Sequence, residues 1–183
     1  MSSPDGPSST LFSGPFIDRR AELRDDPDWI AAARADSGTR YIVATGAEQL
    51  VLAGSAPDLL LLGNDDALVR LADDSWLTLL GWFRGQRTVL IEWAPDVIRR
   101  SSHGIPAGAE LRELRPLAPV LQADVAALLA YARALVLWRS RHLFCGVCGS
   151  ANQRARAGHV MRCSRAGCVT ETFPRLDPAI IVL

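Results

Sequence analysis

The sequence predicts an α+β fold in which a β-rich part is followed by one long helix and a small metal-binding ribbon. Three observations support it: short apolar runs at regular spacing in the first half, one long segment of helical periodicity in the second, and four cysteines confined to positions 145–168. The chain has 183 residues, of which 49% are hydrophobic and 22% charged. We therefore expect a globular protein of one ordinary domain or two small ones.

The N-terminal segment is predicted to be a tail followed by a short helix. Residues 1–14 are rich in Ser, Pro and Gly, which favours a disordered tail. Helical character is expected around Asp28 to Ala35, with Asp28 as the N-cap and Gly38 as the stop.

Residues 15–118 are predicted to form a β-rich domain. The runs at 40–44 and 49–54 flank a turn containing Thr45 and Gly46, which is typical of a hairpin. Residues 95–108, with two Pro and two Gly, are expected to form a loop. Four further apolar runs are predicted to be buried strands: DLLLLG, ALVRLAD, WLTLLGWF and RTVLIEWA. The tryptophans are expected to pack in the core or in grooves: Trp29, Trp76, Trp82, Trp93 and Trp138.

The long segment from Ala123 to Arg141 is the strongest helix prediction, within a connecting region assigned to residues 119–142. Its apolar residues recur mostly at three- and four-residue intervals. Asp124 lies in the first turn, and Arg139 and Arg141 lie in the last, as the helix dipole favours. This helix leads directly into the cysteines.

The cysteines follow the pattern C-x2-C-x14-C-x4-C, within a ribbon assigned to residues 143–173. Two opposed turns of this kind place four thiolates around one tetrahedral Zn²⁺. A site closed by four sulfurs has no position for water, so the zinc is predicted to be structural. His159 is an alternative ligand, but four cysteines already complete the shell. The predicted ligands are Cys145, Cys148, Cys163 and Cys168.

Arginines in and beside the ribbon loop have two interpretations. Four thiolates and one Zn²⁺ carry a formal charge of −2, which nearby cations can offset. The alternative is contact with phosphate or nucleic acid. The residues concerned are Arg154, Arg156, Arg162 and Arg165.

Composition excludes several functions. Acidic and basic residues balance at 20 each, so no strong field favours nucleic acid or an anionic membrane. Every basic residue among these is Arg, which excludes chemistry that needs a phosphate-loop or Schiff-base Lys. No apolar run approaches the roughly 20 residues that span a bilayer, and the N-terminus does not have the pattern of a secretory signal. The clustered cysteines are typical of a reducing compartment, so we expect a cytoplasmic protein.

The C-terminal third resembles a known family. FCGVCG, a 14-residue loop, C-x4-C and then FPRLDPAIIVL are similar to the bacterial NAD(H) diphosphatases of the Nudix superfamily. By this resemblance, the β-rich region is a degenerate Nudix-like domain, and residues 174–183 are the start of a Nudix catalytic domain, including its first strand.

The resemblance implies hydrolysis of NADH or NAD⁺ to nicotinamide mononucleotide and AMP, with NAD-capped RNA as an additional substrate. It also implies Mg²⁺ or Mn²⁺ in the Nudix domain, a homodimer, and substrate contacts from Phe173 and Arg115 in this part of the chain. The family's catalytic motif gathers Glu residues, including an adjacent pair. Here Glu occurs only at 22, 48, 92, 110, 113 and 171, so no such pair exists. We therefore expect a fragment or a truncated relative that has no catalytic residues and is inactive alone.

A second hypothesis is a zinc-ribbon module that binds nucleic acid or a protein partner without enzymatic activity. The Arg-rich loop 154–165 favours it. The zero net charge and the absence of Lys disfavour it, because binding to a phosphate backbone requires many cations.

Overall fold

A computed structural model describes residues 16–100 and 105–174 of the chain. The predicted tail, residues 1–14, lies outside these residues. So does the predicted opening of a catalytic domain, except for Pro174. Within the described part, no helix is long and apolar enough to cross a membrane.

The first part of the chain is built on a seven-stranded mixed sheet. Strand order is β1-β5-β6-β2-β3-β4, with β7 paired to β3. All neighbouring strands are antiparallel except β2 and β6, which run parallel over five residue pairs. The strands are β1 (Ile17–Asp18), β2 (Arg40–Thr45), β3 (Glu48–Leu52), β4 (Asp58–Leu59), β5 (Leu77–Phe83), β6 (Gln86–Glu92) and β7 (Ala109–Glu113).

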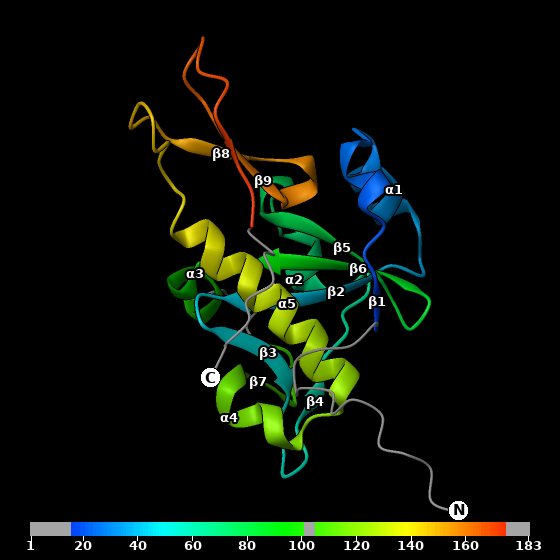
Figure 1. Ribbon diagram of the computed structural model, residues 1–183. Helices are drawn as coiled ribbons and strands as arrows, with labels where there is room; N and C mark the ends of the chain where they lie inside the picture. Colours follow the sequence, from blue (N-terminus) through cyan, green and yellow to red (C-terminus); the bar gives the residue numbers. More distant parts are fainter. Residues whose placement is uncertain (1–15, 101–104, 175–183) are drawn as a thin grey trace, which may run out of the picture.

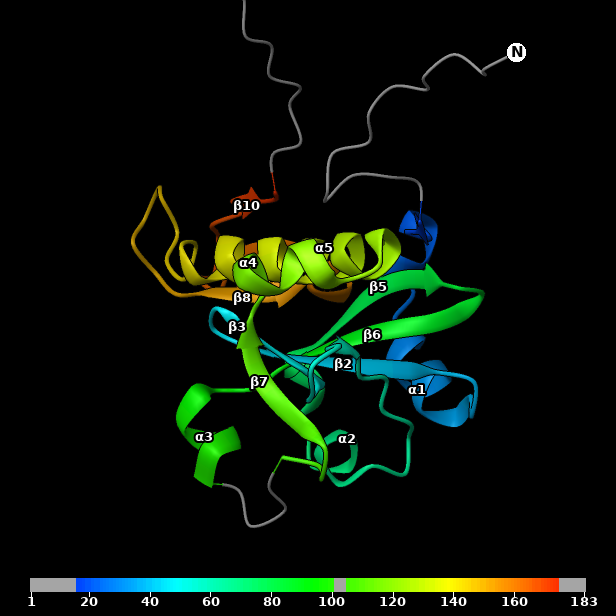
Figure 2. The ribbon, with the colours of Figure 1, turned by 90° about the horizontal axis from the view of Figure 1, so that it is seen from below.

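Helices cover both faces of this sheet (Figure 2). On one face lie α4 (Leu114–Leu117) and the long helix α5 (Ala123–Ser140). On the other lie α1 (Trp29–Ala35), α2 (Ala67–Arg70) and α3 (Pro95–Arg100). Side chains alternate between the two cores as the pleat requires: Ile42 packs with α5, and its neighbours Tyr41 and Val43 pack on the opposite face.

The ribbon is a separate three-stranded antiparallel sheet in the order β10-β9-β8. Its strands are β8 (Asn152–Ala155), β9 (Val160–Cys163) and β10 (Glu171–Thr172), and the turn η4 (Arg156–Gly158) joins the first two. The ribbon begins after the C-terminal end of α5, and its β8–β9 hairpin lies beside β5 (Figure 1).

The structure confirms the α+β class and its strongest predicted elements. Helix α5 begins at Ala123 as expected and has nine buried residues along its length. The predicted hairpin is β2 and β3, joined through Gly46 in the left-handed region at φ 56°. The runs WLTLLGWF and RTVLIEWA form β5 and β6. Trp93 is buried and meets Trp76 edge-on at 4.9 Å between ring centroids.

Three predictions in the first half were wrong. ALVRLAD contains the short helix α2, whose first turn is set by Asp66: its backbone oxygen accepts from Val69 and Arg70. DLLLLG is a strand only at Asp58–Leu59. The loop expected at 95–108 starts with α3, because Pro95 is suited to the first position of a helix.

Helix α1 lies where it was predicted, but the details of its two ends differ from the prediction. Asp28 occupies the N-cap position, but its side chain makes no capping hydrogen bond. The helix ends at Ala35, before the predicted stop. The carboxylate of Asp36 then accepts a 2.8 Å hydrogen bond from the Gly38 amide, so an Asp turn terminates this helix.

Candidate functional site

Four cysteine sulfurs converge at the end of the ribbon, as predicted. One Sγ atom from each lies within 4.8 Å of the others. The shortest separations are 3.4 Å for Cys148–Cys163, 3.8 Å for Cys148–Cys168 and 3.9 Å for Cys145–Cys168. Four sulfurs at 2.3 Å from a tetrahedral zinc lie about 3.8 Å apart. The donor set and its spacing therefore fit one structural Zn²⁺.

Two backbone turns hold these sulfurs in place. In the first, the Val147 amide donates to Cys145 Sγ at 3.5 Å, and Gly149 adopts φ 72°. In the second, the Arg165 amide donates to Cys163 Sγ at 3.4 Å, and Gly167 adopts φ 81° directly before Cys168. The longer C-x4-C turn thus closes because Gly167 enters the left-handed region.

His159 has a structural role and does not replace a cysteine as a ligand. It is buried, and its Nε2 lies 2.7 Å from the backbone oxygen of Leu79 on β5. Burial lowers the pKa of its imidazole to about 4, so the ring is neutral at pH 7 and Nε2 donates to that oxygen. His159 therefore attaches the ribbon hairpin to the large sheet.

The arginines in and beside the ribbon loop mostly form ion pairs with carboxylates. That they offset the charge of the thiolates stays a prediction. Arg154 pairs with Glu92 at 2.8 Å, and Arg162 with Glu171 at 2.6 Å. Nε and Nη2 of Arg156 donate to the two carboxylate oxygens of Asp25, at 2.6 and 2.5 Å. Within the described residues, backbone N–H groups donate to the cysteine sulfurs, and no arginine side chain does so.

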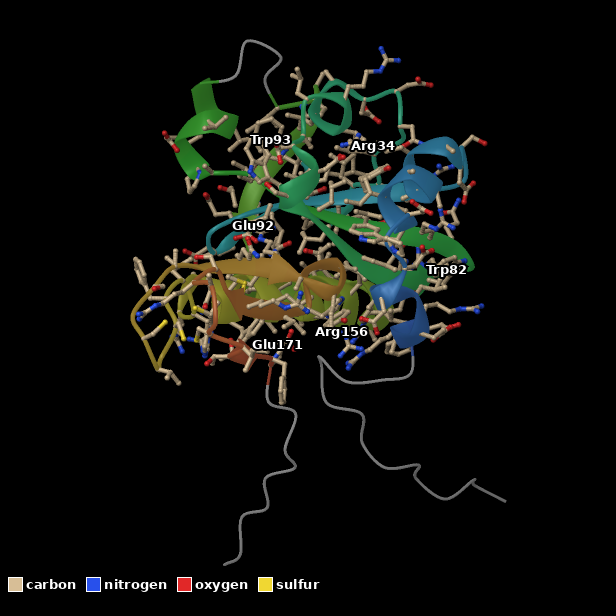
Figure 3. The ribbon with its side chains drawn as sticks, turned by 90° about the horizontal axis from the view of Figure 1, so that it is seen from above. Arg34, Trp82, Glu92, Trp93, Arg156 and Glu171 are labelled. Carbon is tan, nitrogen blue, oxygen red and sulfur yellow. The ribbon has the colours of Figure 1, made fainter. Side chains whose placement is uncertain are left out.

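Glu92 connects the large sheet, α5 and the ribbon (Figure 3). Its Oε2 accepts from Nε and Nη2 of Arg139, at 3.0 and 2.8 Å, and from Nη2 of Arg154, at 2.8 Å. Arg139 also donates through Nη1 to the backbone oxygen of Gly158, at 3.0 Å. Since Arg139 is only 2% exposed, this network anchors the hairpin inside the protein.

The tip of the hairpin requires an unusual backbone. Arg156, Ala157 and Gly158 follow one another with φ values of 49°, 51° and 87°. A Cβ atom on Gly158 would lie 2.4 Å from Thr78 Oγ1 on β5. Only glycine allows the tip to approach the strand this closely.

A cavity of about 350 Å³ lies where the N-terminal segment, α5 and the ribbon meet. Phe173 lines it and is 65% exposed. Arg115 lies exposed on α4 and is not among the residues that line this cavity. The cavity walls also include Arg19, Arg24, Tyr131, Arg156, His159 and Glu171.

Sequence reasoning missed the network around Glu92. A signal was present for Arg139, because it follows Leu135 and Val136 at helical spacing and so continues the apolar face of α5. No local signal connected it to Glu92, which lies 47 residues earlier. Arg19, Arg24 and Tyr131 had no motif that marked them.

Two family models match the chain in succession. The NADH pyrophosphatase-like rudimentary NUDIX domain matches residues 38–138, and the NADH pyrophosphatase zinc ribbon domain matches residues 140–173. The two matches meet at the end of α5, where the ribbon begins.

Similar proteins include NAD-capped RNA hydrolases. NUDT12 of Homo sapiens is 27% identical over 93% of this chain and 45% of its own length. NudC of Mycobacterium tuberculosis is 32% identical over 96% of this chain and 53% of its own length. NudC of Stutzerimonas stutzeri is 37% identical over 57% of this chain and 34% of its own length. Two of these relatives match nearly all of this chain, and the chain spans about half of their length.

Proposed function

Since the chain belongs to the NADH pyrophosphatase family of the Nudix superfamily, we propose that it is the non-catalytic N-terminal and zinc-ribbon part of an NAD(H) diphosphatase. The whole enzyme hydrolyses NADH or NAD⁺ to nicotinamide mononucleotide and AMP, and NAD-capped RNA is a further substrate. One observation carries the proposal: a rudimentary Nudix domain and a four-cysteine ribbon follow each other in one chain and are joined through α5.

The proposed absence of catalysis rests on the carboxylates. Diphosphate cleavage in this superfamily uses Mg²⁺ or Mn²⁺ held by clustered acidic side chains. Among the described residues, the only group of three or more His, Cys, Asp or Glu side chains that could hold a metal is the four cysteines. Most of the glutamates instead pair with arginines: Glu22, Glu48, Glu92, Glu110 and Glu171.

The substrate contacts in this part of the chain are also proposals. We propose that Phe173 stacks on a ring of the dinucleotide; its exposure at the cavity supports this. Arg115 stays a prediction from the family resemblance. We further propose residues 15–118 as the Nudix-like domain, 119–142 as the connecting helix and 143–173 as the ribbon, in a cytoplasmic homodimer.

The test compares the 183-residue chain with a chimera in which the Nudix domain of the Mycobacterium tuberculosis relative follows residue 183. Release of AMP from NADH is measured with Mg²⁺ or Mn²⁺ for both proteins. The chimera should release AMP, and the 183-residue chain should not. AMP release by the shorter chain, at constant specific activity through purification, would contradict the proposal.

The alternative, a nucleic-acid-binding ribbon, has less support. Three of the four arginines that favoured it form ion pairs with carboxylates: Arg154, Arg156 and Arg162. Salt-dependent binding of uncapped RNA by the 183-residue chain would favour this alternative.

A further inference from the structure

Two arginines at the cavity beside Phe173 have no acidic partner in the described ranges. Arg19 and Arg24 both line this cavity, and neither forms an ion pair with a described carboxylate. Arg19 precedes the short 3-10 helix at Ala21–Asp25 and Arg24 lies within it, and both line the cavity from the N-terminal segment. Their charges are therefore available to a ligand.

Tyr131 on α5 orients both guanidinium groups. Arg19 Cζ lies 4.6 Å from the centre of the Tyr131 ring, and Arg24 Nη2 lies 3.4 Å from the Tyr131 hydroxyl. The ring of Tyr131 in turn stacks on His159 at 6.2 Å between centroids. An aromatic wall thus holds the cations without neutralising them, which leaves their outer N–H groups free to donate.

The other charged side chains that line the cavity are already paired. Arg156 donates to Asp25 through Nε and Nη2, and Glu171 is paired with Arg162. Burial raises the pKa of Tyr131 and lowers that of His159, so both rings are neutral at pH 7. The net charge that this cavity presents to a ligand is therefore positive, and it comes from Arg19 and Arg24.

The size of the cavity limits the ligand. Ligand sites commonly measure about 300 to 1,000 Å³, so a cavity of about 350 Å³ is at the small end of that range. Such a volume suits one nucleotide half of a dinucleotide, with a planar ring and one phosphate. Phe173 supplies an exposed aromatic surface for the ring, and the two arginines supply donors for the phosphate.

We propose that this cavity is a mononucleotide subsite in which Arg19 and Arg24 bind a phosphate while the attached ring lies against Phe173. This assignment rests on the proposed function for the identity of the ligand, a phosphorylated half of the dinucleotide. Arg19 and Arg24 are binding residues and take no part in bond cleavage.

The experiment is a calorimetric titration of the 183-residue chain with two matched ligand pairs. One pair is nicotinamide mononucleotide and nicotinamide riboside, and the other is AMP and adenosine. The pairs identify which half is bound, and within each pair only the phosphate differs. The mononucleotide of the bound half should bind at least about 10-fold more tightly than its nucleoside, as expected for charge-assisted hydrogen bonds.

Variants separate the phosphate contact from the ring contact. Arg24→Gln and Arg19→Gln should each weaken mononucleotide binding by about 5- to 10-fold and leave nucleoside binding unchanged. Phe173→Ala should weaken both ligands. Arg70→Gln is the matched control, because Arg70 is an exposed arginine on α2, on the opposite face of the sheet. Circular dichroism checks that each variant is folded.

Three results would overturn the proposal: no saturable binding of either mononucleotide, equal affinity for mononucleotide and nucleoside, or an effect of Arg24→Gln no larger than that of Arg70→Gln. None of these decides the proposed function, since the chimera assay measures hydrolysis independently. Conversely, an inactive chimera with intact phosphate-dependent binding would reject the enzymatic assignment and leave the subsite in place.

Discussion

The two ends of the ribbon hairpin are held by different means. At one end, two cysteine turns converge on a zinc site, and the turns themselves provide the N–H donors to the sulfurs. At the other end, η4 contacts β5 and α5 through Gly158, His159 and Arg139. One end is organised by neighbours in sequence, and the other by residues of a separate sheet.

This difference indicates that the ribbon needs both a metal and a docking surface. The zinc determines whether the hairpin forms, because so small a sheet has little core of its own. The contacts at the tip determine where the hairpin lies, and with it β10 and Phe173. Mutations can separate the formation of the hairpin, which depends on zinc, from its positioning, which depends on the tip contacts.

Loss of zinc should have the largest effect. Cys163→Ser removes one of four ligands, and structural zinc sites of this kind contribute on the order of 10 kcal/mol to folding. We expect β8 and β9 to lose amide-exchange protection while β5 and β6 retain theirs. Hydrogen exchange with mass spectrometry, together with zinc analysis, measures both. Val169→Ser, an exposed change beside Cys168, should keep one zinc per chain. Equal loss of protection in β5 and β6 would show that the two sheets unfold as one unit.

Breaking the buried ion pair should have the next largest effect. Arg139→Met leaves Glu92 with only Arg154 and leaves the Gly158 oxygen without its donor. The free energy of unfolding should fall by about 3 kcal/mol, measured by urea denaturation. Zinc content should stay at one per chain, which separates this end from the metal end. Arg141→Met, an exposed change two residues later, is the control and should cost little. Loss of zinc in Arg139→Met would show that the two ends are coupled.

The pH dependence of stability tests the neutral imidazole at the tip. The folded pKa of His159 is about 4, below its ordinary value near 6.5, so between these values the unfolded chain binds a proton that the folded chain does not. The free energy of unfolding is therefore highest above pH 6.5 with respect to this residue. It falls by about 3 kcal/mol as the pH drops from 6.5 to 4. His159→Gln should therefore show a shallower decline over this range in urea titrations. Identical slopes for both proteins would contradict a buried, neutral His159.

The close approach at Gly158 should give the smallest difference. Gly158→Ala and Gly85→Ala both place a Cβ at positive φ, 87° and 76° respectively. Only Gly158 lies against another side chain, since nothing lies within 4 Å of a Cβ at Gly85. Gly158→Ala should cost about 1 to 3 kcal/mol more than Gly85→Ala in thermal or urea unfolding. Adding Thr78→Ala should recover part of that excess. Equal costs would mean that the tip does not press on β5.

The same division explains what could be predicted from the sequence. The zinc ligands and α5 depend on spacings of a few residues, so local sequence patterns predict them. ALVRLAD was misassigned because short apolar runs fit a strand and a buried helical turn equally well. The docking contacts include pairs 47 to 131 positions apart, such as Arg139 with Glu92 and Arg156 with Asp25. Periodicity within one segment carries no information about such pairs.

The length of the hairpin has a consequence for protein engineering. Each arm has four residues, which at about 3.3 Å per residue gives a reach of about 13 Å from the cysteine turns to the tip. The 14 residues between Cys148 and Cys163 thus set the distance between the zinc site and the large sheet. A transplanted ribbon with shorter arms could still coordinate zinc, yet it would fall short of β5 and leave β10 without a fixed position. Grafting should therefore preserve this spacing before any side chain is optimised.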